Sequence, residues 1–282
     1  AEDKRQAKLA EEKRLAKIAE DKRQAKLAEE KRLAKIAEDK RQAKLAEEKR
    51  LAKIVEEQRL LADQGDASAQ AYLGGEYFLG ESVPQDYAKA LKWYRLAADQ
   101  GYANAQFLLG AMYQDGRGVP QDDVEAVKWY RLAADQGNSL GQLSIGKRYM
   151  GGLGVPKDGV EALKWLRLVA DQGNAIAQVL VGIIYDNGNE LGLDIPQDYE
   201  EAVKWYRLAA DQGYANAQFN LGSMYRDGKG VPEDDALAAK LYRLAADQGL
   251  GIAQLFLGFF YKEGEGVPQN DVMAYKWLNL AA

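Results

Sequence analysis

The 282-residue chain has neither cysteine nor histidine. Their absence excludes disulfide bonds, thiolate nucleophiles, zinc sites built from these residues, and catalytic triads that depend on histidine. Long apolar runs are also missing, and none approaches the about 20 residues that a membrane-spanning helix needs. We therefore expect no membrane insertion in this segment. The chain shows no signal sequence and does not begin with Met, so its start indicates no compartment.

Positive charge is scarcer than negative charge, since 38 Lys and Arg stand against 43 Asp and Glu. The net charge of −5 argues against a protein that binds nucleic acid duplexes. Hydrophobic residues make up 47% of the chain, which favours a folded core over disorder. The length alone suggests about two domains.

The first 54 residues are three identical copies of AEDKRQAKLAEEKRLAKI. Nearly all of these residues are strong helix formers, and no Gly or Pro occurs before Gly65. Eighteen residues make five whole turns, so equivalent positions lie on one line along the helix. The two related halves of each copy face opposite ways, and no broad apolar stripe results. The pattern predicts a straight charged helix that acts as a rigid rod, roughly 96 Å long.

A coiled coil with a second copy of the chain is the main alternative for this segment. A weak apolar stripe would mediate such self-association, and it consists of Leu15, Ile18, Leu33, Ile36, Leu51 and Ile54. A membrane-surface helix is disfavoured because the apolar side is mostly Ala and acidic residues are interspersed. The segment has 18 basic and 12 acidic residues, a charge of +6, which leaves −11 for residues 55–282.

A second repeat with a period of 36 residues follows the rod. We place its six copies at 66–101, 102–137, 138–173, 174–213, 214–249 and 250–282. All six prolines share one repeat position: Pro84, Pro120, Pro156, Pro196, Pro232 and Pro268. All five tryptophans share another, where the fifth copy has Leu241. This register indicates that neither residue type marks a special site.

Each copy predicts a helix, a turn and a second helix. In the second copy, Ala105, Leu109 and Met112 have helical spacing. Asp122 is predicted to cap the second helix, with Glu125 completing a capping box. A glycine recurs within the first helix, where it costs about 1 kcal/mol relative to Ala. Its recurrence predicts a close approach of two helix backbones at Gly74, Gly110, Gly146, Gly182, Gly222 and Gly258.

The motifs A-x-A-Q-x-x-L-G-x-x-Y, G-x-G-V-P-x-D and A-x-x-W-Y-R-x-A-A-D-Q-G resemble the Sel-one-like repeat, a relative of the tetratricopeptide repeat. The resemblance covers residues 66–282 and implies an all-α superhelical solenoid. It also implies an adaptor that holds a protein or peptide ligand. The sequence leaves the compartment unknown, although the resemblance favours the bacterial envelope or secretion over the cytoplasm if the protein is natural. Some members have a disulfide in each repeat, and this chain resembles the branch without cysteine.

The rod joins the repeats without a break in helical pattern. VEEQRLLADQG (55–65) aligns with LKWYRLAADQG (91–101). We therefore predict that one helix continues from the rod to about Gln64 and takes the place of a second helix from a missing repeat. The predicted domains are a charged helix at 1–54 and a solenoid at 55–282.

No arrangement of residues indicates a catalytic, cofactor or metal site. The G-x-G turns follow a helix and precede Val-Pro, unlike a phosphate-binding loop. The four extra residues of the fourth copy lie in an acidic segment, 189–197, without the spacing of a calcium loop. We interpret this segment as a solvated loop.

Binding is predicted on the face where solenoids are most variable, the first helix of each copy. Three positions in each copy vary: Ser68, Tyr72, Gly75; Asn104, Leu108, Ala111; Leu140, Ser144, Lys147; Ile176, Leu180, Ile183; Asn216, Asn220, Ser223; and Ile252, Phe256, Phe259. The residues selected for partner contact are Tyr72, Leu108, Lys147, Ile176, Leu180, Ile183, Asn220, Phe256 and Phe259. The apolar sets of the fourth and sixth copies are either a partner site or part of the core.

Two functions are compatible with these observations. The first is a non-enzymatic interaction scaffold, in which the rod is a stalk that presents the solenoid. The second is an engineered fusion that uses the straight helix as a spacer, with no native activity of its own. Identical 18-residue copies fit either design or recent duplication.

Overall fold

The structure is a computed structural model that describes residues 2–281, which fold into thirteen α-helices and contain no strand. The helices are α1 (Glu2–Asp63), α2 (Ala67–Leu79), α3 (Tyr87–Asp99), α4 (Ala103–Asp115), α5 (Asp123–Asp135), α6 (Ser139–Gly151), α7 (Gly159–Ala170), α8 (Ala175–Asn187), α9 (Tyr199–Asp211), α10 (Ala215–Asp227), α11 (Asp235–Asp247), α12 (Gly251–Glu263) and α13 (Asp271–Ala281).

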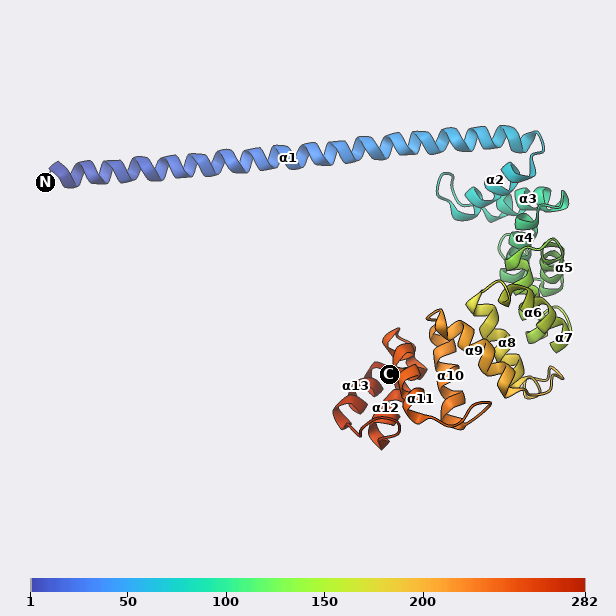
Figure 1. The fold of residues 1–282 in the computed structure, drawn as a ribbon. Helices are drawn as coiled ribbons and strands as arrows, with labels where there is room; N and C mark the ends of the chain where they lie inside the picture. The colour runs from blue at the N-terminus through green and yellow to red at the C-terminus, as the bar shows by residue number, and fades with distance from the viewer. Residues whose placement is uncertain (1, 282) are drawn as a thin grey trace.

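Helix α1 is a straight rod that extends away from the other helices (Figure 1). Its 62 residues correspond to about 93 Å of helix. Residues 4–50 are all exposed, and ion pairs of the expected spacing run along the surface, including Arg14–Glu11 and Lys26–Glu30. Each exposed pair contributes only a few tenths of a kcal/mol, so intrinsic helix propensity must supply much of the stability.

The remaining helices form the predicted solenoid. Every helix contacts the helices that precede and follow it in the sequence, which gives a one-dimensional stack. The stack follows a curved path, with α4 and α6 toward the inside of the curve and α5 and α7 toward the outside (Figure 1). The variable first helices of these repeats therefore lie on the concave side.

The second helices begin at capping aspartates, but the predicted capping box is only half formed. The Asp122 carboxylate accepts the Glu125 N–H at 2.9 Å, as expected. The Asp122 N–H is already used, because it donates to the Tyr113 carbonyl at 2.9 Å. The Glu125 carboxylate instead accepts the Trp129 indole N–H at 3.1 Å. The reciprocal half of the prediction was therefore wrong, and Glu161 and Glu201 repeat the same pairing with tryptophan.

Consecutive repeats are joined by a recurring arginine and a recurring glutamine. In the first junction Arg95 of α3 donates to the Tyr113 hydroxyl of α4, and its guanidinium lies 5.9 Å from the Trp129 ring centre. Buried Gln106 donates to the Ala98 carbonyl at 3.1 Å, across the same interface. These polar contacts orient each repeat against the previous one, because a buried amide must find its partner.

The end of α1 makes these same contacts with the first repeat. Arg59 donates to the Tyr77 hydroxyl at 3.0 Å, and Gln70 donates to the Ala62 carbonyl at 3.1 Å. Among the described side chains, Val55 is the first that is buried, with 7% exposed. The prediction that the rod continues into the solenoid is confirmed, since its last turns occupy the place of a preceding second helix.

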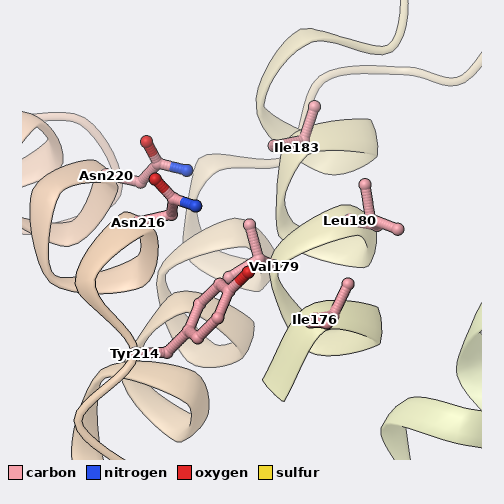
Figure 2. A pocket seen from close by; sticks show the side chains of 7 residues that line it. All are labelled: Ile176, Val179, Leu180, Ile183, Tyr214, Asn216 and Asn220. Carbon is pink, nitrogen blue, oxygen red and sulfur yellow. The ribbon is translucent and has the colours of Figure 1, made fainter. Parts of the chain in front are cut away.

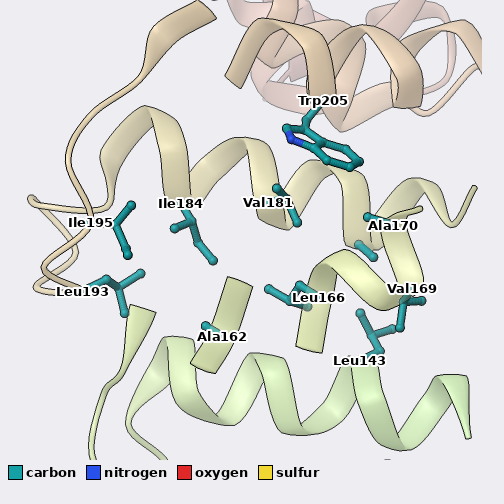
Figure 3. Packing of buried hydrophobic residues seen from close by; sticks show 11 residues of the cluster. Leu143, Ala162, Leu166, Val169, Ala170, Val181, Ile184, Leu193, Ile195 and Trp205 are labelled. Carbon is teal, nitrogen blue, oxygen red and sulfur yellow. The ribbon is translucent and has the colours of Figure 1, made fainter. Parts of the chain in front are cut away.

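The core passes continuously between repeats and includes part of the insertion in the fourth repeat. Leu166 of α7 packs with Ile184 of α8 and with Trp205 of α9 (Figure 3). Leu193 and Ile195 of the insertion join this cluster and are 3% and 8% exposed. The interpretation of 189–197 as a solvated loop was therefore incomplete, because two apolar side chains fold back onto the core.

The recurrent glycine of the first helix makes room chiefly for a side chain of the second helix. A Cβ atom on Gly182 would lie 2.6 Å from Cε1 of the Tyr206 ring. Where the second helix has leucine instead, the glycine faces that leucine, as Gly146 faces Leu166. The close approach of the two helices was correctly predicted. The contact is formed mainly by a side chain of the second helix that packs against the glycine, and less by the two backbones.

Replacing this glycine should destabilise the solenoid. We expect Gly182→Ala to lower the free energy of unfolding by about 1–3 kcal/mol, because the methyl group overlaps the Tyr206 ring. Gly251→Ala is the control, since no atom lies within 4 Å of its added Cβ. Urea unfolding followed by circular dichroism measures both, and equal stability of the two variants would contradict this packing role.

Candidate binding face

The structure places none of the eighteen variable positions in the core. Ile176 is 39% exposed and Phe259 is 45% exposed, and Lys147 is also exposed. The other predicted contact residues, which are Tyr72, Leu108, Leu180, Ile183, Asn220 and Phe256, are half-buried. Side chains of this kind are accessible on one side and held by packing on the other.

Four predicted residues meet in one pocket of about 280 Å³ between α8 and α10. Ile176, Leu180 and Ile183 form a column along α8, and Asn220 faces them from α10 (Figure 2). Their spacing of four and three residues places the three aliphatic side chains on one helix face. The pocket is slightly smaller than the about 300–1,000 Å³ typical of whole small-molecule ligands. It suits one or two side chains of a larger partner.

Three further residues line this pocket and were not selected from the sequence: Val179, Tyr214 and Asn216. Val179 is a buried core residue with 6% exposed, and Tyr214 precedes α10 as its capping residue. Asn216 stood among the variable positions, and its spacing of four residues from Asn220 could have singled it out.

The other predicted residues lie outside this pocket. Tyr72, Leu108 and Lys147 belong to α2, α4 and α6. Phe256 and Phe259 lie on α12, where the Phe256 ring centre is 5.4 Å from that of Phe219 on α10. The Arg226 guanidinium also lies 5.0 Å from the Phe256 ring centre. The aromatic residues therefore border α10 on the side away from α8.

A polar pair joins α8 and α9, where the hydroxyl of buried Tyr206 donates to the half-buried Asp186 carboxylate at 3.3 Å. Burial raises the pKa of Asp186 above its ordinary value, although the Tyr206 hydrogen bond and Lys229 act against this rise. Burial also raises the pKa of Tyr206, and the Asp186 charge adds to that effect. The carboxylate therefore costs folding stability when it is ionised.

Neither a metal centre nor a membrane segment is formed by residues 2–281. No group of three or more acidic side chains is placed to hold a metal ion within that range. None of its helices is both long and apolar enough to cross a membrane. The arrangement on α8, α10 and α12 offers packing and amide hydrogen bonds, which are means of binding.

A family model for the Sel1 repeat matches this chain six times, at residues 67–102, 103–138, 139–174, 175–214, 215–250 and 251–282. The chain belongs to the Sel1 repeat family. Sel1 repeat proteins are protein-interaction scaffolds and are generally non-catalytic. The resemblance stated from the sequence motifs is thereby confirmed.

Two solved Sel1-type structures are similar to this chain. One is a protective antigen of uropathogenic Escherichia coli strains with an SLR fold, at 38% identity and a TM-score of 0.75. The match covers 82% of this chain and 49% of the antigen, so this chain spans about half its length. The other is a Sel1 repeat protein from Oxalobacter formigenes, at 35% identity and a TM-score of 0.69, with 78% and 86% covered. No curated protein matches the chain.

The raised pKa of Asp186 leads to a prediction about pH. A carboxyl group with a raised pKa in the folded state destabilises the fold above that pKa, where it must ionise. We expect Asp186→Asn to raise Tm at pH 7 while keeping an acceptor for Tyr206. The gain should vanish below about pH 3.9, the ordinary pKa of aspartate, because the wild-type group is then protonated in both states.

Thermal unfolding between pH 3 and pH 8 measures this effect. Asp194→Asn is the control, since Asp194 is exposed on the insertion and should give no pH-dependent change. A lower Tm for Asp186→Asn at pH 7 would show that the charged form is favoured instead.

Proposed function

We propose that this chain is a non-enzymatic adaptor that holds a protein or peptide on the concave face of its solenoid. The observation that carries the proposal is the pocket between α8 and α10, where three aliphatic side chains remain accessible. Exposed apolar clusters on soluble proteins commonly mark interaction sites. Membership in a family of interaction scaffolds supports the same function.

Matched charge substitutions test this proposal. Leu180→Glu places a carboxylate in the pocket, whereas Leu208→Glu places one on α9 at a leucine that is 50% exposed. Each variant serves as bait in lysate of cells that express the protein, and retained proteins are quantified by mass spectrometry. We expect partners of the wild type to persist with Leu208→Glu and to fall by at least about tenfold with Leu180→Glu. Equal retention by both variants would refute a partner site in this pocket.

We propose further that residues 1–54 form a stalk and residues 55–282 form the solenoid. The exposure of residues 4–50 and the burial of Val55 support a boundary at this point. Leu15, Ile18, Leu33 and Ile36 are exposed, while Leu51 and Ile54 are half-buried. Association of two stalks through these side chains would be weak, because charged residues separate the apolar pairs.

Two truncations test this division. Deleting residues 1–54 should leave Tm nearly unchanged, because only exposed helix is lost. Deleting residues 1–65 removes Val55, Ala62 and the Arg59 hydrogen bond, and should cost about 2–4 kcal/mol. Thermal unfolding measures the stability of each truncated chain. Light scattering measures whether the molar mass rises with protein concentration, and whether that rise is lost without residues 1–54. Equal loss of stability in the two truncated chains would place the boundary nearer the N-terminus.

The identity of the three 18-residue copies favours a second candidate, an engineered spacer fused to a repeat protein. The coding sequence distinguishes the two origins. Duplication leaves the same codons in each copy, whereas a synthetic gene normally varies them.

A further inference from the structure

We propose that the face formed by the first helices of the last repeats binds an extended, uncharged peptide segment that crosses α8, α10 and α12, with apolar side chains on either side of paired asparagine amides. The inference rests on the proposed function and specifies the form and chemistry of the bound partner. Its two outer contacts are the pocket on α8 and the aromatic residues of α12. Its central contact is the pair Asn216 and Asn220 on α10.

The first argument is that the variable positions of this face carry almost no charge, although the Arg226 guanidinium lies beside Phe256. None of the eighteen variable positions is buried, and only Lys147 among them is charged at neutral pH. Charged residues make up 29% of the whole chain, so a surface of that size would ordinarily hold about five. A partner that enters this face therefore gains little from charge. Neutral segments, which lose no ionic hydration on binding, are favoured.

The second argument concerns the two amides of α10. Asn216 and Asn220 are four residues apart on one helix face and extend toward α8 (Figure 2). Each carboxamide presents both a donor and an acceptor, as a peptide group of the main chain does. The main chain of an extended segment has free N–H and C=O groups, whereas that of a helix is already paired. The amides thus favour an extended occupant over a helical one.

The third argument is that the Asn216 amide has no partner within the fold, whereas the neighbouring Asn220 side chain already contacts the Tyr206 hydroxyl. In the second repeat, Asn104 occupies the position of Asn216, but its amide oxygen accepts from Asn138 at 2.7 Å. The sixth repeat has Leu250 where the third has Asn138, so no such bond forms. Within the described residues, Asn216 makes no side-chain hydrogen bond. The change at Leu250 leaves the groove at α10 with an unused amide.

The apolar contacts on both sides define the peptide's pattern. A helix is about 10 Å or more in diameter, and an extended chain advances about 3.3 Å per residue. A segment that reaches from α8 across α10 to α12 therefore needs at least about six residues. Alternate side chains of an extended chain face the same way, so the two apolar anchors must have even spacing. One anchor enters the pocket beside Leu180, and the other packs on Phe256 and Phe259.

A library of random 12-residue peptides displayed on phage and panned on the full chain tests this inference. We expect enriched peptides with two large apolar residues at even spacing and few charges between them. Affinities of the synthesised peptides should fall at least about tenfold with Leu180→Glu or Ile176→Glu. Ile176 is 39% exposed, so its variant should fold even if Leu180→Glu does not. Leu208→Glu, on α9 at a leucine that is 50% exposed, should change affinity less than about twofold.

Methylation of one main-chain nitrogen between the anchors tests the amide contacts. Methylation should weaken binding to the wild type at least about tenfold. It should cause little further loss of affinity for the double variant Asn216→Ala/Asn220→Ala. The inference would be overturned if the enriched peptides shared a charged consensus, or if they bound as helices and methylation had no effect. It would also be overturned if only Leu208→Glu lowered the affinity. Enrichment of no peptide would also overturn it. The proposed function would still stand if the Leu180→Glu bait lost a folded protein partner.

Discussion

A pair of 13-residue helices has apolar side chains on two sides, and the solenoid depends on covering both of them. The neighbouring repeats do this, so each interface is at once the core of two repeats. The buried glutamine and the arginine that donates to a tyrosine hydroxyl recur at these interfaces with little change. They add direction to an otherwise nonspecific apolar contact, because an amide that misses its carbonyl partner is buried at a cost.

The same requirement explains why the rod is part of the stack. The first repeat also needs cover on its outer side, and the last turns of α1 supply it through Val55 and Ala62. Most of α1 has few apolar residues, and its apolar C-terminal turns attach it to the first repeat. Continuity of the helix then fixes the direction of the rod relative to the repeats, without a hinge of glycine or proline between residues 2 and 63.

The fold could be predicted because proline and tryptophan keep strict register through all six copies. Features that do not recur in every copy could not be predicted in this way. Leu193 and Ile195 lie in an insertion with no equivalent, so nothing in the repeat indicated that they fold back onto the core. The variable positions include the three aliphatic residues of α8 that line the pocket. They could not show that Asn104 bonds to Asn138 while Asn216 has no such partner, since that difference arises between repeats 34 residues apart.

The rod has a geometric consequence for anything attached to its two ends. Eighteen residues complete five turns and advance about 27 Å, so adding or removing one whole copy shifts the solenoid along the rod axis without rotating it. A change of nine residues would instead turn the concave face through half a circle. The number of identical copies therefore sets the length of the rod without changing the orientation of the solenoid about the rod axis.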